Sequence, residues 1–210
     1  MEKSHKGENI MENTMIILPI IALRGITILP NMIVHFDVSR TKSVNALEKA
    51  MITDQKVFLV TQKDGEGDDP SFDDLYKMGT IAIVKQLIKL PNNIIRVLIE
   101  GKQRGELIKF TEEDTALIGE IQIIEDTDTS DLDDITKEAM MRIVKELLSR
   151  YNLVNPKVNQ DTVKLLKEAK TIDELLDQIG VHIPIDFEEK QHLWEAIDLS
   201  ARYEQLTRIL

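Results

Sequence analysis

The sequence predicts an α+β fold in which a mostly antiparallel sheet or small β-barrel precedes a group of helices. In the first half, short segments rich in Ile, Val and Leu are bounded by turn residues, which is typical of strands. After Ile124 the apolar residues recur at helical spacing. The acidic stretch EDTDTSDLDD lies between the two halves. We therefore expect a disordered leader over residues 1–14, a β-domain over residues 15–125 and a helical subdomain over residues 126–210.

Seven segments of the first half have the length and composition of strands. Proline, asparagine and glycine residues separate them, and among these we interpret Gly101, Gly105 and Gly119 as turn residues. The predicted strands are Met15–Ile21, Ile33–Val38, Lys56–Thr61, Thr80–Leu87, Ile94–Glu100, Leu107–Phe110 and Ala116–Ile124.

One hairpin and one helix stand out within this half. In the hairpin KQLIKL-PNN-IIRVLIEG, Pro91 fixes φ for a turn and Asn93 tolerates the left-handed region that closes it. The helix begins at Thr41, a candidate N-cap, and places Val44, Leu47, Ala50 and Met51 on one apolar face.

The second half predicts a series of amphipathic helices. The first is long and ends near Asn155-Pro156, and a shorter one follows over Gln160–Ala169. A third begins at the capping box Thr171–Glu174 and ends at Gly180, and a fourth begins at Asp186–Glu189. The last segment, SARYEQLTRIL, has no stop signal, so we expect the chain to be cut within a long helix. The apolar positions of the long helix are Ile135, Ala139, Met140, Ile143, Val144, Leu147, Leu148 and Tyr151.

The composition excludes several classes of protein. The 210 residues include no cysteine, which excludes disulfides, thiolate zinc sites, iron–sulfur clusters and cysteine nucleophiles. The longest uncharged apolar run, Met15–Leu23, contains Pro19 and is far shorter than the ~20 residues of a membrane span. The first fourteen residues have no signal-peptide pattern. We expect a cytoplasmic protein with no membrane partner.

Motifs for catalysis and for nucleotide binding are absent from the sequence. It contains no G-x-x-x-x-G-K-[ST] loop, no G-x-S-x-G elbow and no H-E-x-x-H pair. We therefore expect no catalytic and no cofactor-binding residues in this chain.

Two patterns resemble metal sites but fail when each position is compared. Asp126 and Asp128 match positions 1 and 3 of a calcium loop, but Asp131 replaces the required glycine, so we interpret the stretch as a solvated linker. Glu189-x-x-His192 has metal-binding spacing without the further ligands of a di-iron bundle, and an exposed helix face is the simpler interpretation. We expect no metal site, and we interpret His35 and His182 as hydrogen-bonded structural histidines.

A basic stretch raises the question of nucleic-acid binding. Residues 85–109 hold six bases and two acids, and the carboxylates concentrate in residues 64–74 and 112–138, so the net charge of −11 does not by itself exclude RNA. However, Phe110 is the single aromatic near this stretch, which leaves no stacking platform. We expect no nucleic-acid partner.

An apolar segment around the turn Pro30-Asn31 is the candidate binding surface. If the turn exposes Leu29, Met32 and Ile33, these side chains form an adhesive patch for unfolded polypeptide; burial in the core is the alternative. Trp194 is either a core anchor of the helical half or an interface residue.

Four strings, in order, resemble the N-terminal region of the Lon family of ATP-dependent serine proteases. They cover about Ile17 to the C-terminus. Ser39, Asn92-Asn93-Ile94 and Gly105 depart from the family pattern, and these are turn and packing changes. The strings are ILPIIALRGITILPNMIVHFDVSR, KSVNALEKAM with DQKVFLVTQKD, LYKMGTIAIVKQLIKLPNNIIRVLIEGKQRGEL, and IPIDFEEKQHLWEAIDLSARYEQL.

The resemblance implies a PUA-like β-domain followed by a helical subdomain that runs into a long helix. It implies a non-catalytic region that selects unfolded or misfolded proteins, within a homohexamer whose ATPase and Ser–Lys protease domains lie elsewhere and use ATP and Mg. For the isolated chain we expect a monomer or weak dimer without enzymatic activity. Two alternatives stay open: a stand-alone PUA-like protein that binds RNA or a ligand, and a small hydrolase with an unrecognised site.

Overall fold

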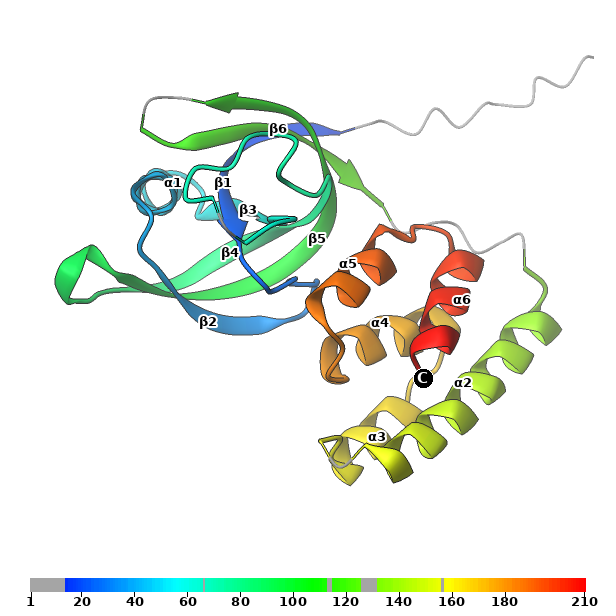
Figure 1. The fold of residues 1–210 in the computed structure, drawn as a ribbon. Helices are drawn as coiled ribbons and strands as arrows, with labels where there is room; N and C mark the ends of the chain where they lie inside the picture. The colour runs from blue at the N-terminus through cyan, green and yellow to red at the C-terminus, as the bar shows by residue number, and fades with distance from the viewer. Residues whose placement is uncertain (1–13, 66, 113–114, 126–131, 156) are drawn as a thin grey trace, which may run out of the picture.

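A computed structural model of the chain describes residues 14–65, 67–112, 115–125, 132–155 and 157–210 (Figure 1). Most of the expected leader, residues 1–13, and residues 126–131 of the acidic connector lie outside the described residues. The strands are β1 (Met15–Leu23), β2 (Ile33–Val38), β3 (Lys56–Thr61), β4 (Met78–Lys89), β5 (Ile95–Glu112) and β6 (Leu117–Ile124). The helices are α1 (Thr41–Met51), α2 (Asp134–Val154), α3 (Gln160–Lys167), α4 (Ile172–His182), α5 (Phe187–Glu195) and α6 (Leu199–Ile209).

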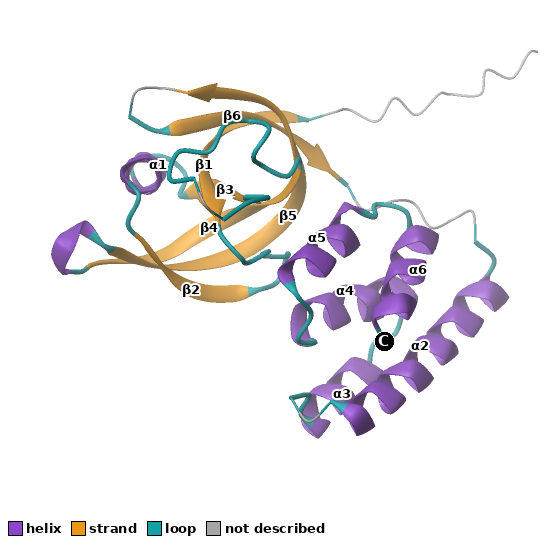
Figure 2. Cartoon of the chain, viewed as in Figure 1, coloured by secondary structure: helices purple, strands orange, loops and turns teal. Residues whose placement is uncertain are grey.

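Apart from α1, which lies between β2 and β3 and packs on the barrel, the named helices follow the strands in the chain and gather beside the barrel, which confirms the α+β prediction (Figure 2). The strand order is β2-β5-β4-β3-β1-β6, and β6 pairs with β5 as well as with β1. Five strands therefore form a closed barrel, and β2 is attached to β5 on its outside. All pairs of strands are antiparallel except β1 and β3, where Ile20 is opposite Phe58. No helix in the described part of the chain has both the length and the apolar character that crossing a bilayer requires.

The long strand β5 corrects the prediction of two separate strands at Ile94–Glu100 and Leu107–Phe110. It continues through Gly101 and Gly105, with an irregularity in its pairing to β4 between them, so these glycines are not turn residues. A Cβ atom on Gly101 would lie 2.4 Å from the carbonyl oxygen of Leu29, and one on Gly105 would lie 2.7 Å from Ile121. These glycines let other parts of the chain approach the strand closely.

The β4–β5 hairpin is built as the sequence predicts. A single helical turn over Pro91–Asn93 connects the strands, and Asn93 has a φ of 58°. Asn92 also lies in the left-handed region, with a φ of 62°. Asparagine adopts this conformation more readily than most residues, which explains the Asn-Asn pair.

Helix α1 covers the barrel with the apolar face that the sequence predicts. Val44, Leu47 and Ala50 are buried in the barrel core, whereas Met51 is 37 % exposed. The capping prediction is wrong, because Thr41 is already helical and Arg40 occupies the N-cap position without a side-chain hydrogen bond.

In α2 the buried stripe is narrower than predicted. Met140, Val144 and Leu148 face the helical core, whereas Ile135 and Ile143 are exposed on a neighbouring stripe. The helix ends at Val154, immediately before Asn155, as the asparagine–proline pair predicts. The buried stripe is consistent with packing against α3, α4 and α6.

Helix α4 begins as predicted but does not end at Gly180. The Thr171 side chain accepts a hydrogen bond from the Glu174 N–H, which confirms one half of the capping box. The helix continues to His182, and a Cβ on Gly180 would lie 3.2 Å from both Leu193 and Leu29. Gly180 therefore serves close packing between α4, α5 and the barrel instead of terminating the helix. In α5 the N-cap Asp186 makes no side-chain capping bond, and α3 ends at Lys167, two residues before the predicted Ala169.

Candidate functional site

Backbone hydrogen bonds hold the turn between β1 and β2, which carries the predicted binding residues, against β5. The Met32 N–H donates to the Leu29 carbonyl over 3.2 Å, and Asn31 has a φ of 65°, so Leu29–Met32 has the features of a type II turn. The Asn31 N–H donates to the Gly101 carbonyl, and the Gly101 N–H donates to the Met32 carbonyl, over 3.0 and 2.9 Å. These two bonds around one residue of β5 are a glycine-type β-bulge with asparagine in the glycine position, which fixes the turn against β5.

Leu29 is buried, which is the alternative to exposure that the sequence left open for this segment. Its side chain is 3 % exposed and packs with Met78 and Trp194 at the junction of the barrel and the helices. Met32 is half-buried, and its sulfur accepts a hydrogen bond from the Leu29 N–H. Ile33, at the start of β2, is 65 % exposed. Of the three predicted residues, Ile33 therefore presents the most surface to a partner.

Helix α5 joins the two halves of the molecule by polar contacts to the backbone of the barrel. The Trp194 indole N–H donates to the Gly79 carbonyl over 3.2 Å, and the Gln191 amide donates to the Met78 carbonyl over 2.9 Å. The Thr27 hydroxyl donates to the carbonyl of Phe187 at the start of α5. Trp194 is thus a buried anchor at the junction of barrel and helices, which is neither the core of the helical half nor an exposed interface.

Arg104 lies under the same tryptophan. Its side chain is 2 % exposed, and its guanidinium carbon lies 3.9 Å from the centre of the Trp194 ring. A cation on the face of an indole ring is stabilised by the ring quadrupole, most strongly where water is excluded. No local pattern predicts this contact, since the two residues are ninety positions apart in the chain.

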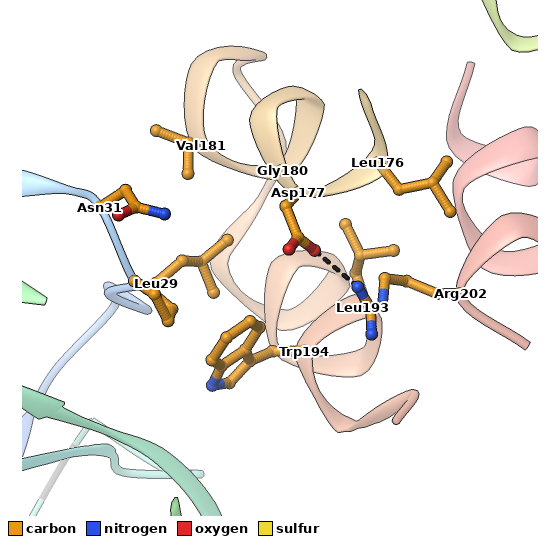
Figure 3. Close-up of a pocket in the computed structure, with 10 residues that line it drawn as sticks. Leu29, Asn31, Leu176, Asp177, Gly180, Val181, Leu193, Trp194 and Arg202 are labelled. Carbon is orange, nitrogen blue, oxygen red and sulfur yellow. Dashed lines mark hydrogen bonds and ion pairs between the residues drawn. The ribbon is translucent and has the colours of Figure 1, made fainter. Parts of the chain in front are cut away.

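The pocket at this junction is too small for an organic ligand. Figure 3 shows Leu29, Val181, Leu193 and Trp194 around it, with the Asp177–Arg202 ion pair at one side. Its volume is about 20 Å³, which is room for about one water molecule. The junction is therefore a packed contact between barrel and helices and not a ligand site.

The residues considered as metal ligands and structural histidines are dispersed. Among the described residues, no group of three or more His, Asp or Glu side chains is placed to hold a metal ion. Glu189 and His192 are both exposed on α5, as expected of a helix face. His35 and His182 are also exposed, which corrects their interpretation as residues in apolar surroundings.

Ion pairs offset much of the positive charge in the basic stretch. The Arg96 guanidinium donates two hydrogen bonds, of 2.7 and 2.8 Å, to the Asp37 carboxylate, and these hold the pKa of Asp37 below its usual value. Lys85 and Lys102 both contact Glu100, and the hydrogen bonds from these two lysines lower the pKa of that carboxyl. Further ion pairs join Lys89 to Glu48 and Lys109 to Glu120.

Comparisons with known proteins agree with this architecture. Residues 17–210 match the family model of the ATP-dependent protease La (LON) substrate-binding domain. The chain is 40 % identical over 193 residues to a Lon protease of Lachnoclostridium phytofermentans and 35 % identical over 185 residues to Lon protease 1 of Bacillus subtilis. These alignments cover 92 % and 88 % of this chain but 24 % of each relative. The chain thus spans about a quarter of the length of the curated relatives it matches.

Solved structures share the fold. The N-terminal domain of a Mycobacterium avium complex Lon protease superposes with a TM-score of 0.69 at 18 % identity, over 91 % of this chain and 96 % of that one. A Lon N-terminal domain protein from Xanthomonas campestris gives a TM-score of 0.62 at 14 % identity, over 92 % and 98 %. The stand-alone RNA- or ligand-binding alternative is not favoured by any of these matches. The chain belongs to the substrate-binding domain family of ATP-dependent protease La (LON).

Proposed function

We propose that this domain recognises unfolded or damaged proteins and holds them for ATP-driven degradation by the whole protease. The observation that carries the proposal is the match of residues 17–210 to a substrate-binding domain model. In the whole protein, ATP and Mg would serve an ATPase module and a Ser–Lys protease module outside this chain. We place this activity in the cytoplasm and in a homohexamer that the domain helps to assemble.

The exposed apolar side chains support a preference for unfolded protein. Unfolded chains expose the apolar segments that folded proteins bury, and removing apolar area from water favours association. Ile33 and the half-buried Met32 lie together at the end of the fixed turn. The small pocket at the junction offers no competing site for an organic ligand of ordinary size.

A binding measurement tests the proposal. The purified chain is titrated with one reporter protein in its folded form and in a permanently unfolded form. We expect the unfolded form to bind more tightly, and Ile33→Ser to weaken that binding about 3- to 10-fold. Ile135→Ser is the matched control, because Ile135 is 81 % exposed on α2, outside the barrel, and should leave the affinity unchanged. Equal affinity for both forms of the reporter would contradict the proposal.

The isolated chain should lack enzymatic activity and should not form the hexamer by itself. The expected state in light scattering is a monomer or weak dimer, with assembly depending on the other modules. Turnover of ATP or of a peptide by the purified chain, or a stable hexamer in solution, would contradict these expectations.

A further inference from the structure

Strand β2 has an unpaired edge. Within the described residues it pairs only with β5, from Ile33 opposite Glu100 to Val38 opposite Ile95, and it is the end strand of the sheet. Figure 1 shows β2 on the outside of the barrel, with no strand beyond it. An unpaired edge presents backbone N–H and C=O groups that can pair with another extended chain.

The bulge at Asn31 determines which residues of β2 present these groups. The Gly101 N–H donates to the Met32 carbonyl, and in an antiparallel ladder the residues that bond to the partner strand alternate along the chain. The backbone N–H and C=O groups of Val34, Phe36 and Val38 therefore bond to β5, whereas those of Ile33, His35 and Asp37 face outward. The side chains of Ile33, His35 and Asp37 are exposed as well. The edge thus offers three donors and three acceptors in the spacing of a strand.

A groove of about 250 Å³ runs beside the second half of this edge. Its apolar lining includes Phe36 and Val38 of β2 and Ile21 and Leu23 of β1. The C-terminal half of β1 pairs with β3 alone, because β6 pairs only with Met15–Pro19. Among the described residues, no strand pairs with the outer edge of β2 or with the free side of the C-terminal half of β1, and the groove lies between them.

Charged side chains around the groove have hydrogen-bond partners within the molecule. Arg24 contacts Asp68 over 2.9 Å, and Asp37 is bound by Arg96. Arg40 donates to the Ala22 carbonyl and to the Gln62 side chain. The apolar lining that Ile21, Leu23, Phe36 and Val38 contribute to the groove favours an apolar side chain there, because its burial removes apolar area from water.

We propose that an extended segment of an unfolded protein adds to β2 as a further strand and places an apolar side chain in the groove beside Phe36. This inference rests on the proposed function and names the kind of segment it would bind: extended, apolar and free of proline. Backbone pairing suits a domain with many substrates, because every residue except proline presents the same N–H and C=O groups.

A second copy of the chain fits the edge less well. An antiparallel pair of β2 strands centred on His35 would place the exposed Ile33 of one copy against Asp37 of the other. Such pairing gains little apolar contact and crowds a carboxylate that already binds Arg96. We therefore assign the edge to a foreign peptide, and dimerisation becomes an outcome of the test.

The test uses a short fluorescent peptide of alternating Val and Thr residues and the complete 210-residue chain. Two further peptides carry N-methyl groups on one or the other set of alternate amides. Only one set can face β2, so one N-methylated peptide should lose about tenfold or more in affinity and the other should bind like the parent. Hydrogen exchange should show slower exchange of the Ile33, His35 and Asp37 amides when the parent peptide binds.

A pair of variants tests the same edge from the protein side. His35→Pro removes an outward N–H at a position where an edge strand tolerates proline, and it should reduce peptide affinity about tenfold. His35→Thr keeps the N–H and should bind like the original chain. If His35→Pro does not fold, the N-methylated peptides and the exchange measurement on the unchanged chain decide the matter.

The outcomes separate this inference from the proposed function. Binding of the parent peptide with equal affinity for both N-methylated peptides, and without protection on β2, would overturn edge pairing but leave recognition of unfolded protein standing. Failure to bind both the peptide and an unfolded protein would overturn the proposed function. Protection of the same amides that grows with protein concentration, without peptide, would assign the edge to a second copy and overturn the inference.

Discussion

Gln191 is a buried polar residue on α5 whose bonds join the two halves of the molecule. Its side chain is 1 % exposed, and its amide donates to the Met78 carbonyl over 2.9 Å. Gln191→Met keeps the length of the side chain but leaves the Met78 carbonyl without this donor. We expect a loss of about 1–3 kcal/mol in the free energy of unfolding, measured by chemical denaturation. Gln103→Met, at an exposed position of β5, is the control and should change it by less than about 0.5 kcal/mol.

Asp37 gives the stability of the chain a defined dependence on pH. The hydrogen bonds from Arg96 lower the pKa of Asp37 in the folded state. A carboxyl with a lowered pKa stabilises the fold above its unfolded-state pKa, about 3.9, and this contribution is lost as the pH falls through the folded-state pKa. Asp37→Asn should therefore be less stable than the original chain at neutral pH and equal to it in strong acid. A difference that stays constant across that range would contradict the assignment.

At the scale of the element, β5 depends on glycine at the point where the turn before β2 crosses it. The hypothetical Cβ of residue 101 would lie 2.4 Å from the Leu29 carbonyl oxygen, which is backbone and cannot move aside easily. Gly101→Ala should cost about 2–3 kcal/mol in the free energy of unfolding. Gly65→Ala is the matched control, because a Cβ there meets no atom within 4 Å. Equal stability of both variants in denaturant titrations would show that the turn shifts without cost.

Gly101 and Gly180 show where the prediction of helices and strands from the sequence fails, while other elements show where it succeeds. The spacing of apolar residues predicts most strands and helices because it depends on which side chains a segment buries. The hairpin at Pro91 and the N-cap at Thr171 are predictable because they depend on neighbouring residues alone. The interpretations of Gly101 as a turn residue and of Gly180 as a helix terminator are wrong because each glycine makes room for a residue far away in the sequence, Leu29 in both cases. Close approach of remote segments leaves no local pattern in a single sequence.

The candidate site is likewise predictable only in part from the sequence. The apolar character of the Ile26–Val34 segment is evident from the sequence, but only tertiary contacts decide that Leu29 is buried and Ile33 exposed. Likewise, the free edge of β2 depends on which strands pair with β5, and β5 pairs with β4, β6 and β2 over different parts of its length. Strand pairing is a property of the complete sheet, so the sequence of β2 alone could not indicate it.

At the scale of the whole molecule, the barrel and the helices have separate apolar cores that meet through a small cluster. Leu29, Met78 and Trp194 are the buried members of that cluster. We expect the chain to unfold in a single transition, because Trp194 couples the halves through its ring contacts and its bond to Gly79. Trp194→Ala removes both and should cost about 3–5 kcal/mol.

The coupling can be measured by following each half separately through the transition. In Trp194→Ala, the amides of α4 should exchange with solvent before those of β4, whereas in the original chain both should become exposed together. Trp194→Phe is the control: it keeps an aromatic face for Arg104 but loses the N–H donor and part of the ring, so it should retain one transition at a moderately lower stability. If the two halves of Trp194→Ala still unfold together, the coupling passes instead through the hydrogen bonds of Gln191 and Thr27. The barrel and the helices would then unfold as one cooperative unit even without the tryptophan.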